Sequence, residues 1–211
     1  MKSAIIRLVE RTTAFACYTQ FRSSYLAESG WYESFRKRRS VDRHGQPLPW
    51  ITYPAISFLG PRLTTSMAVF EYGCGNSTLW FAARVGSIVS CEHEPAWFDE
   101  IKPILPVNAT LKLRSLDGGY AGCVAEDGAQ YDVILIDGRN RNDCIEIALS
   151  SLKSKGVIML DNSERDDYAP GIKLLFERGF RSIAFDGPGP IVSAAWRTTV
   201  FYRTGANCLG I

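Results

Sequence analysis

The chain has 211 residues, 46% of them apolar, and carries 24 Lys and Arg against 22 Asp and Glu. It can bury a full core and is most simply one domain with an appendage. No apolar stretch is long enough to span a bilayer, and charged residues interrupt the apolar N-terminus where a signal peptide needs a clean run. We therefore expect a cytoplasmic protein.

The basic residues gather in the N-terminal part of the chain. Residues 1–60 hold nine Lys and Arg against four Asp and Glu, which leaves about three net negative charges on the remainder. The densest run, Arg-Lys-Arg-Arg at 36–39, would face a phosphate, an acidic glycan or a membrane surface, or would form a solvated face. No interleaved aromatic pattern accompanies this run, so we expect no nucleic-acid partner.

The same part of the chain has the pattern of a helical extension. Apolar residues recur at helical spacing between Ile5 and Leu26, which predicts one amphipathic helix. This helix would dock on the domain, pair with a second copy in a homodimer, or make a peripheral membrane contact, and docking is the default. Residues 28–30 break the pattern, and residues 45–50 form a turn-rich linker before a short helix at 54–59.

From Met67 onward, apolar runs and helical patterns alternate, which is typical of a Rossmann-like, doubly wound α/β sheet. Strands are expected at 68–72, 87–92, 110–114, 131–136, 157–160, 181–185 and 198–202, and helices at 77–84 (capped by Ser77), 97–105, 145–152 (ended by Lys155-Gly156) and 169–178. The last two strands are joined without a helical pattern, which predicts an antiparallel hairpin at a sheet edge. We divide the chain into an N-terminal arm, residues 1–60, and a second domain, residues 61–211.

The first expected strand runs into a glycine-containing turn. Its sequence is Glu71-Tyr72-Gly73-Cys74-Gly75-Asn76-Ser77, and glycines there let the backbone approach a ligand closely. The acid would repel a pyrophosphate but attract a ligand that carries a sulfonium and an ammonium group. Thr78 also replaces the third glycine of the dinucleotide fingerprint. The turn therefore favours S-adenosylmethionine, and an NAD-dependent enzyme is the disfavoured alternative.

Three later strands also end in acids. Glu92-His93-Glu94, Asp137-Gly138-Arg139 and Asp161-Asn162 follow the second, fourth and fifth expected strands. Ligands of open parallel sheets bind beyond the carboxyl ends of the strands, so these residues belong to one candidate site. Glu92 follows Gly75 by about the distance at which such folds place the acid that accepts ribose hydroxyls.

Taken together, these motifs resemble the class I S-adenosylmethionine-dependent methyltransferases over roughly residues 65–203. The resemblance implies a seven-stranded sheet, mostly parallel, with its last strand inserted antiparallel. It implies that the glycines pass under the methionine part of the cofactor, that Glu71 holds its ammonium group and that Glu92 holds its ribose. The implied cofactor-binding residues are Glu71, Gly73, Cys74, Gly75, Asn76, Ser77, Glu92, His93 and Asp137.

A further similarity, to cation-dependent O-methyltransferases, concerns metal binding. Asp137, Asp161 and Asn162 stand where those enzymes keep their Mg²⁺ ligands, so Mg²⁺ or another divalent cation is a candidate cofactor. This chain has Asn140 where those enzymes carry a general-base lysine. The alternative is that no metal is used and that Asp137, Glu164 or His44 removes the proton. Without a metal, Asp137 would otherwise only shape the pocket, and Asp161-Asn162 would cap a strand and turn. The expected catalytic residues are Asp137 and Asp161.

The expected function is methyl transfer to a hydroxyl of a small-molecule or glycan-type acceptor. The stretches at 136–141, 161–163 and 198–203 further resemble bacterial methyltransferases that often accompany glycan and secondary-metabolite genes, which implies only an acceptor class. Trp50, Tyr53 and Trp196 would line an acceptor pocket or simply pack in the core. The alternative function is a non-catalytic cofactor-binding scaffold that acts through the basic arm.

Overall fold

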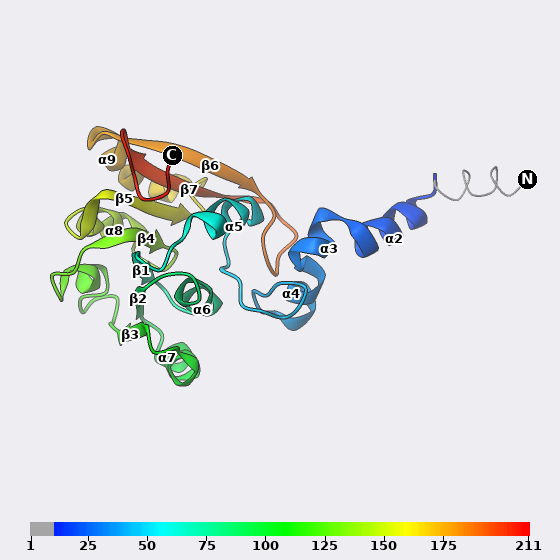
Figure 1. Ribbon diagram of the computed structural model, residues 1–211, viewed down its shortest axis with the longest axis horizontal. Coiled ribbons are helices and arrows are strands. Elements are labelled where there is room, and N and C mark those ends of the chain that lie inside the picture. Colours follow the sequence, from blue (N-terminus) through cyan, green and yellow to red (C-terminus); the bar gives the residue numbers. More distant parts are fainter. Residues whose placement is uncertain (1–10) are drawn as a thin grey trace, which may run out of the picture.

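The computed structural model describes residues 11–211 and is built around one seven-stranded sheet (Figure 1). The strands are β1 (Ala68–Tyr72), β2 (Ser87–Glu92), β3 (Ala109–Leu113), β4 (Tyr131–Ile136), β5 (Leu152–Asp161), β6 (Phe180–Gly187) and β7 (Trp196–Arg203). Their order is β3-β2-β1-β4-β5-β7-β6. The first five are parallel, whereas β7 runs antiparallel to both β5 and β6. The Rossmann-like fold and the edge hairpin are confirmed.

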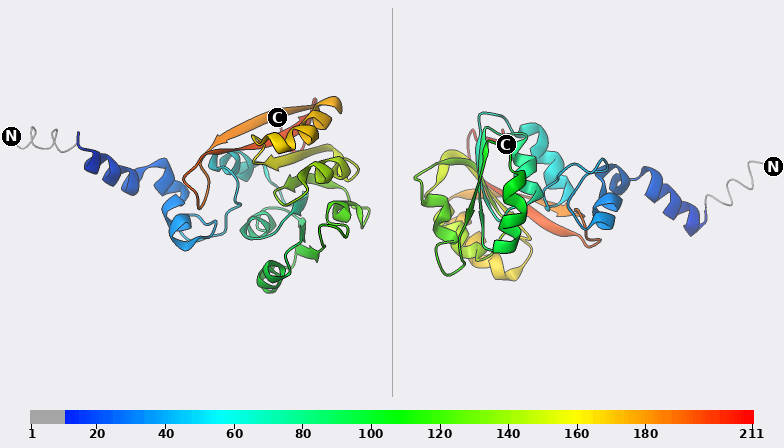
Figure 2. Two further views of the ribbon diagram at one scale, coloured as in Figure 1. Left: turned by 180° about the vertical axis from the view of Figure 1, so that it is seen from behind. Right: turned by 90° about the horizontal axis from the view of Figure 1, so that it is seen from below.

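Helices cover both faces of the sheet (Figure 2). Because successive side chains of a strand point to opposite faces, Phe70 packs in one apolar cluster and its neighbour Val69 in the other. The Phe70 side is covered by α8 (Arg141–Ala148), α9 (Ala169–Glu177) and the 3₁₀ turn η3 (Ala121–Ala125), and the Val69 side by α5 (Tyr53–Leu59) and α6 (Asn76–Ala82). The remaining elements after α5 are α7 (Pro95–Ile101) and the 3₁₀ turns η1 (Gly60–Arg62), η2 (Lys102–Ile104) and η4 (Asp166–Tyr168). This is a doubly wound arrangement.

The N-terminal arm contains α2 (Thr13–Ser23), α3 (Tyr25–Ser29) and α4 (Trp31–Lys37). The prediction of one helix from 5 to 26 is wrong, because Ser24 is extended and its hydroxyl caps α3 by accepting from Ala27 N at 3.1 Å. Residues 5–10 of that expected helix lie outside the described part. Docking of α2 is also wrong, since it has no buried residue and projects away from the domain (Figure 1).

Two other sequence predictions fail at element boundaries. The helix expected at 145–152 begins at Arg141, and Leu152 already belongs to β5. Gly156 lies inside that strand, where an added Cβ would stand 2.7 Å from Leu152 Cδ1, so this glycine serves packing and does not end a helix. Ser77 is not the cap of α6, because Gly75 is its N-cap and the backbone N–H of Gly75 donates to Thr78 Oγ1 at 3.1 Å.

The core includes residues from before position 61. Ile51, Ala55 and Leu59 are fully buried in the same apolar cluster as Val69 and Trp80. The division of the chain at residue 60 stays a prediction. Among the described residues, no helix has the length and apolarity that a bilayer crossing requires.

Candidate functional site

A cavity of about 720 Å³ lies at the carboxyl ends of β1, β2, β4 and β5. Every candidate cofactor, catalytic and metal residue predicted from the sequence lines it: Glu71, Gly73, Cys74, Gly75, Asn76, Ser77, Glu92, His93, Asp137, Asp161 and Asn162. The other side of the cavity is formed by the arm, through residues that include Arg38, Ser40 and Trp50, and by the β6–β7 connection. The parallel strands thus bring four distant sequence motifs to one place.

The turn after β1 has backbone conformations that favour glycine. Gly73 has φ 102° and Gly75 has φ 153°. An added Cβ at Gly73 would make only ordinary van der Waals contact with its nearest neighbour, Gly138 at 3.9 Å, and Gly73 lines the cavity. An added Cβ at Gly75 would stand 3.4 Å from the indole of Trp97, whose Nε1 donates to Cys74 O at 2.8 Å. This turn exposes backbone to the cavity and is fixed by the indole of Trp97, which lines the same cavity.

Glu71 is a buried acid at the base of this turn, with 1% of its surface exposed. Its Oε2 accepts hydrogen bonds from the hydroxyls of Thr78 at 2.6 Å and Ser90 at 2.8 Å. Burial raises the pKa of Glu71 to about 7, against hydrogen bonds that lower it. No ion pair joins Glu71 to a cationic side chain within residues 11–211. A cationic ligand in the cavity would supply the missing counter-charge.

Glu92 ends β2 and is 4% exposed. Its Oε1 accepts from the backbone N–H groups of His93 at 2.7 Å and Glu94 at 2.8 Å, which fixes the carboxylate at the cavity wall. The ring of His93 packs edge-on against Tyr120. Burial and the nearby Glu92 raise the pKa of the Cys74 thiol, so this thiol stays protonated and is a poor nucleophile.

Asn76 and Ser77 line the cavity from the first turn of α6. The side-chain amide of Asn76 donates to Ser40 O at 2.6 Å, which attaches the arm to this helix. The arm, including linker residues Leu48 and Trp50, is therefore part of the cavity wall. His44 does not line the cavity, and its Nε2 accepts from Arg43 at the exposed surface.

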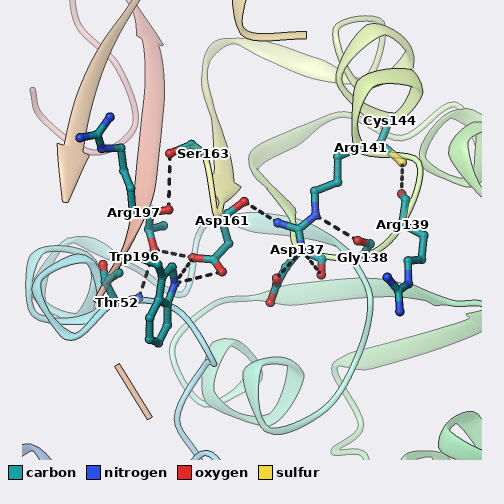
Figure 3. A network of polar contacts seen from close by, with 11 residues as sticks. Thr52, Asp137, Gly138, Arg139, Arg141, Cys144, Asp161, Ser163, Trp196 and Arg197 are labelled. Carbon is teal, nitrogen blue, oxygen red and sulfur yellow. Dashed lines mark hydrogen bonds and ion pairs between the residues drawn. The ribbon is translucent and has the colours of Figure 1, made fainter. Parts of the chain in front are cut away.

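Arg141 holds the ends of β4 and β5 together (Figure 3). Its guanidinium donates to Gly138 O at 3.0 Å, to Asp137 O at 3.0 Å and to the carbonyl of Asp161. Nη2 also lies 3.1 Å from Asp137 Oδ1. Burial and the neighbouring Asp161 raise the pKa of Asp137 well above its usual range, and Arg141 opposes them.

Asp161 is 2% exposed, and its carboxylate is occupied by hydrogen bonds (Figure 3). Oδ1 accepts from Thr198 at 2.6 Å, and the indole Nε1 of Trp196 lies 3.0 Å from Oδ1 and 3.2 Å from Oδ2. Burial raises the pKa of Asp161 to about 6, against these two hydrogen bonds. Asp161 therefore anchors β7 at the cavity.

The donor set at Asp137, Asp161 and Asn162 does not fit a divalent cation in this arrangement. The Arg141 guanidinium already neutralises Asp137, and both Asp161 oxygens receive protein donors. A divalent cation needs carboxylate oxygens that are open to it, and Oδ2 of Asp137 is the one oxygen of these two acids without a protein donor among residues 11–211. Across residues 11–211 there is no group of three or more His, Cys, Asp or Glu that would hold a metal ion.

Several residues of the site were not predicted from the sequence. Thr78 and Ser90 hold Glu71, and Trp97 backs the glycine turn. Trp31 in α4 donates to Val192 O at 2.8 Å and so ties the arm to the β6–β7 connection, across 161 residues of sequence. Among the expected aromatic wall residues, Trp50 and Trp196 line the cavity, whereas Tyr53 is buried in the core.

The chain matches no protein-family model, and no curated protein matches its sequence. Solved structures do match it. An O-methyltransferase from Bacillus cereus in complex with SAH has a TM-score of 0.60 at 17% identity, covering 93% of this chain and 100% of that one. A putative O-methyltransferase from Klebsiella pneumoniae has a TM-score of 0.59 at 18% identity, covering 91% and 97%.

A third similar structure is the O-methyltransferase TomG from Streptomyces achromogenes in complex with SAM, with a TM-score of 0.56 at 18% identity, covering 93% of this chain and 98% of that one. The chain has the class I methyltransferase fold. In an open α/β fold of this kind, ligands bind beyond the carboxyl ends of the strands, where the strand order reverses. Here the order reverses between β1 and β4, and Glu71 and Asp137 stand on the two sides of that point.

Proposed function

We propose that this protein is an S-adenosylmethionine-dependent methyltransferase that methylates a hydroxyl group of a small-molecule or glycan-type acceptor. One observation carries the proposal. Glu71 is a buried acid without a cationic partner among the described residues, and it lines the same cavity as the glycine turn, Glu92 and Asp137. An uncompensated buried acid costs free energy, and a cationic ligand removes that cost.

The residues around the cavity fit this cofactor part by part. The carboxylate of Glu71 would face the ammonium group, and the open space beside Gly73 admits the methionine chain. The second buried acid, Glu92, would accept the ribose hydroxyls, with His93 beside the adenine. When bound, S-adenosylmethionine supplies a methyl group already activated by a positively charged sulfur.

The protein therefore has two tasks, to align the acceptor oxygen with the methyl carbon and to take up its proton. The residues of the cavity would hold S-adenosylmethionine and the acceptor so that the methyl group could pass from sulfur to the acceptor oxygen, with the bonding electron pair left on sulfur. The hydroxyl proton passes to a carboxylate. In-line alignment lowers the barrier without a covalent enzyme intermediate.

Asp137 is the proposed proton acceptor. Its raised pKa makes it a stronger base than a free carboxylate, and Arg141 contacts only Oδ1 of the two carboxylate oxygens. Glu164 also lines the cavity, but its Oε2 accepts from the backbone of Arg197 at 3.0 Å. His44 lies outside the cavity lining. Asp161 would be a positioning residue, because its carboxylate holds Trp196 and β7 in place.

The proposed reaction uses no divalent cation, because the Arg141 guanidinium already supplies a positive charge beside Asp137. The test is transfer of a labelled methyl group from S-adenosylmethionine to a panel of catechols and sugars and to a small-molecule extract, with EDTA present. We expect labelled product from the wild type, from Glu146→Gln on the exposed face of α8, and none above background from Asp137→Asn.

Labelled product from the wild type only after Mg²⁺ is added would contradict the cation-independent version. Cofactor binding without transfer to any acceptor would favour the scaffold function. Equal turnover by Asp137→Asn and the wild type would remove Asp137 from the role of base.

A further inference from the structure

Three arginines line the cavity without a carboxylate partner. Arg38 comes from the C-terminal cap of α4, Arg139 from the turn after β4, and Arg165 from the segment between β5 and η4. All three residues are exposed. Within residues 11–211 none of their guanidinium groups lies within ion-pair distance of an acid. Three separate segments therefore bring positive charge without a direct ion pair to one cavity, and Arg165 also lies close enough to Asp137 to lower the pKa of that acid.

The other charges of the cavity are paired or buried except Glu164, which is exposed and accepts from the backbone N–H of Arg197 at 3.0 Å. Arg39 contacts Glu100, and Arg141 contacts Asp137. The acids Glu71, Glu92 and Asp161 are buried at the strand ends and hold hydroxyl, amide or indole donors. The cavity thus combines an acidic interior with an exposed wall on which the three arginines outnumber the single acid Glu164.

The arm holds Arg38 in position at this wall. Two residues further along, Ser40 O accepts from the Asn76 amide at 2.6 Å, which fixes the chain against α6. Arg38 has a left-handed backbone with φ 53°, and its guanidinium lies 4.7 Å from the ring centre of Phe35. The contact with an exposed ring leaves the guanidinium edge open to a ligand.

We propose that the methyl acceptor carries an anionic group, a carboxylate or a phosphate, that Arg38, Arg139 and Arg165 bind while the acceptor hydroxyl faces Asp137. This inference rests on the proposed function, and it narrows the acceptor to acidic compounds. Guanidinium groups are suited to both anions because they donate two parallel hydrogen bonds to a pair of oxygens.

The test measures anion binding to the full-length protein saturated with S-adenosylhomocysteine, by calorimetry at constant ionic strength. Inorganic phosphate and glucuronate are titrated separately, which distinguishes a phosphate-bearing from a carboxylate-bearing acceptor. The variants are Arg38→Gln, Arg139→Gln and Arg165→Gln, singly and combined. The matched control is Arg43→Gln, which changes an exposed arginine of the same basic segment outside the cavity lining.

We expect the wild type and Arg43→Gln to bind at least one of the two anions equally, and the triple variant to bind it about tenfold or more weakly. Affinity for S-adenosylhomocysteine should be the same in all variants, which also shows that they fold. Loss of that affinity in the triple variant would instead assign the arginines to the cofactor's own carboxylate and overturn the proposal. Binding of neither anion by the wild type would overturn it as well.

A second readout uses the labelled products of the methyl-transfer reaction. Acidic acceptors methylated on a hydroxyl keep their negative charge, so the products should be retained by an anion-exchange resin at pH 8. Neutral products from an active wild-type enzyme would refute the acidic acceptor and leave the methyltransferase function intact. A protein that binds no S-adenosylhomocysteine would refute the proposed function itself.

Discussion

The hydroxyl of Thr78 lies 2.6 Å from Oε2 of Glu71 and donates a hydrogen bond to it. Thr78 is the residue that replaces the third glycine of a dinucleotide-binding turn. In this protein its hydroxyl orients a buried acid and accepts from the backbone N–H of Gly75. The residue that argues against a dinucleotide site thus also builds the proposed site for a cation.

Glu71→Gln should weaken S-adenosylmethionine binding by about ten- to a hundredfold, because it removes the charge that faces the cation and keeps the side-chain shape. Calorimetric titration at pH 8 measures this. Asp99→Asn, an exposed change in α7, is the control and should bind like the wild type. Equal affinities for Glu71→Gln and the wild type would remove Glu71 from the cofactor site.

Cofactor binding should release a proton from Glu71. The pKa of this buried acid is about 7, and a bound cation favours the carboxylate, so it lowers that pKa. Below pH 7 the wild-type affinity should fall by up to about tenfold per pH unit, relative to Glu71→Gln measured in parallel. Calorimetry in buffers of different ionisation enthalpy counts the proton. If the ratio of the wild-type affinity to the Glu71→Gln affinity for S-adenosylmethionine did not change with pH, this prediction would be contradicted.

Glu71 should also make stability depend on pH in the absence of cofactor. Its folded-state pKa of about 7 exceeds its ordinary value of 4.5, so the folded state binds the proton more tightly. The corresponding stability is fully present below pH 4.5 and is lost as pH rises to about 7, by about 3 kcal/mol in all. The free energy of unfolding in urea is measured for Glu71→Gln and the wild type at pH 5 and pH 8. The variant should be more stable relative to the wild type at pH 8 than at pH 5. The same difference in unfolding free energy at both pH values would argue against a raised pKa of Glu71.

Arg141→Lys should destabilise the protein by about 2–4 kcal/mol in urea unfolding, because an ammonium group cannot reach the three carbonyls and the carboxylate that the guanidinium joins. Arg141 is 7% exposed. Arg178→Lys, an exposed change after α9, should stay within about 0.5 kcal/mol of the wild type. A similar small effect at Arg141 would show that it does not hold β4 and β5 together.

The positions of most strands could be predicted from the sequence, because local patterns determine them. The mostly apolar run Tyr131–Ile136 predicts a central strand, and β4 has the same bounds in the structure. The convergence of Glu71, Glu92, Asp137 and Asp161 could also be predicted, since parallel strands end at one edge of the sheet. Both inferences use short stretches of sequence and a general rule of topology.

The contacts that complete the site could not be predicted in this way. No role for Arg141 is predicted from the sequence, but in the structure it is buried and donates to the carbonyls of Gly138 and Asp161. The indole of Trp31 reaches Val192 across 161 residues of sequence. Such hydrogen bonds depend on the packed fold, and the spacing of apolar residues in the sequence does not predict them. The break at Ser24 was missed for a related reason, since its capping hydroxyl outweighs the apolar spacing.

The central claim is that the cavity binds a cationic methyl donor. Its most direct test is calorimetric titration of the full-length protein with S-adenosylmethionine and, separately, with NAD⁺, at pH 8 with EDTA present. We predict one molecule of S-adenosylmethionine bound per chain, no binding of NAD⁺, and loss of binding in Gly73→Arg, whose side chain would fill the space beside the turn. Binding of NAD⁺ in place of S-adenosylmethionine, or unchanged binding in Gly73→Arg, would contradict the account.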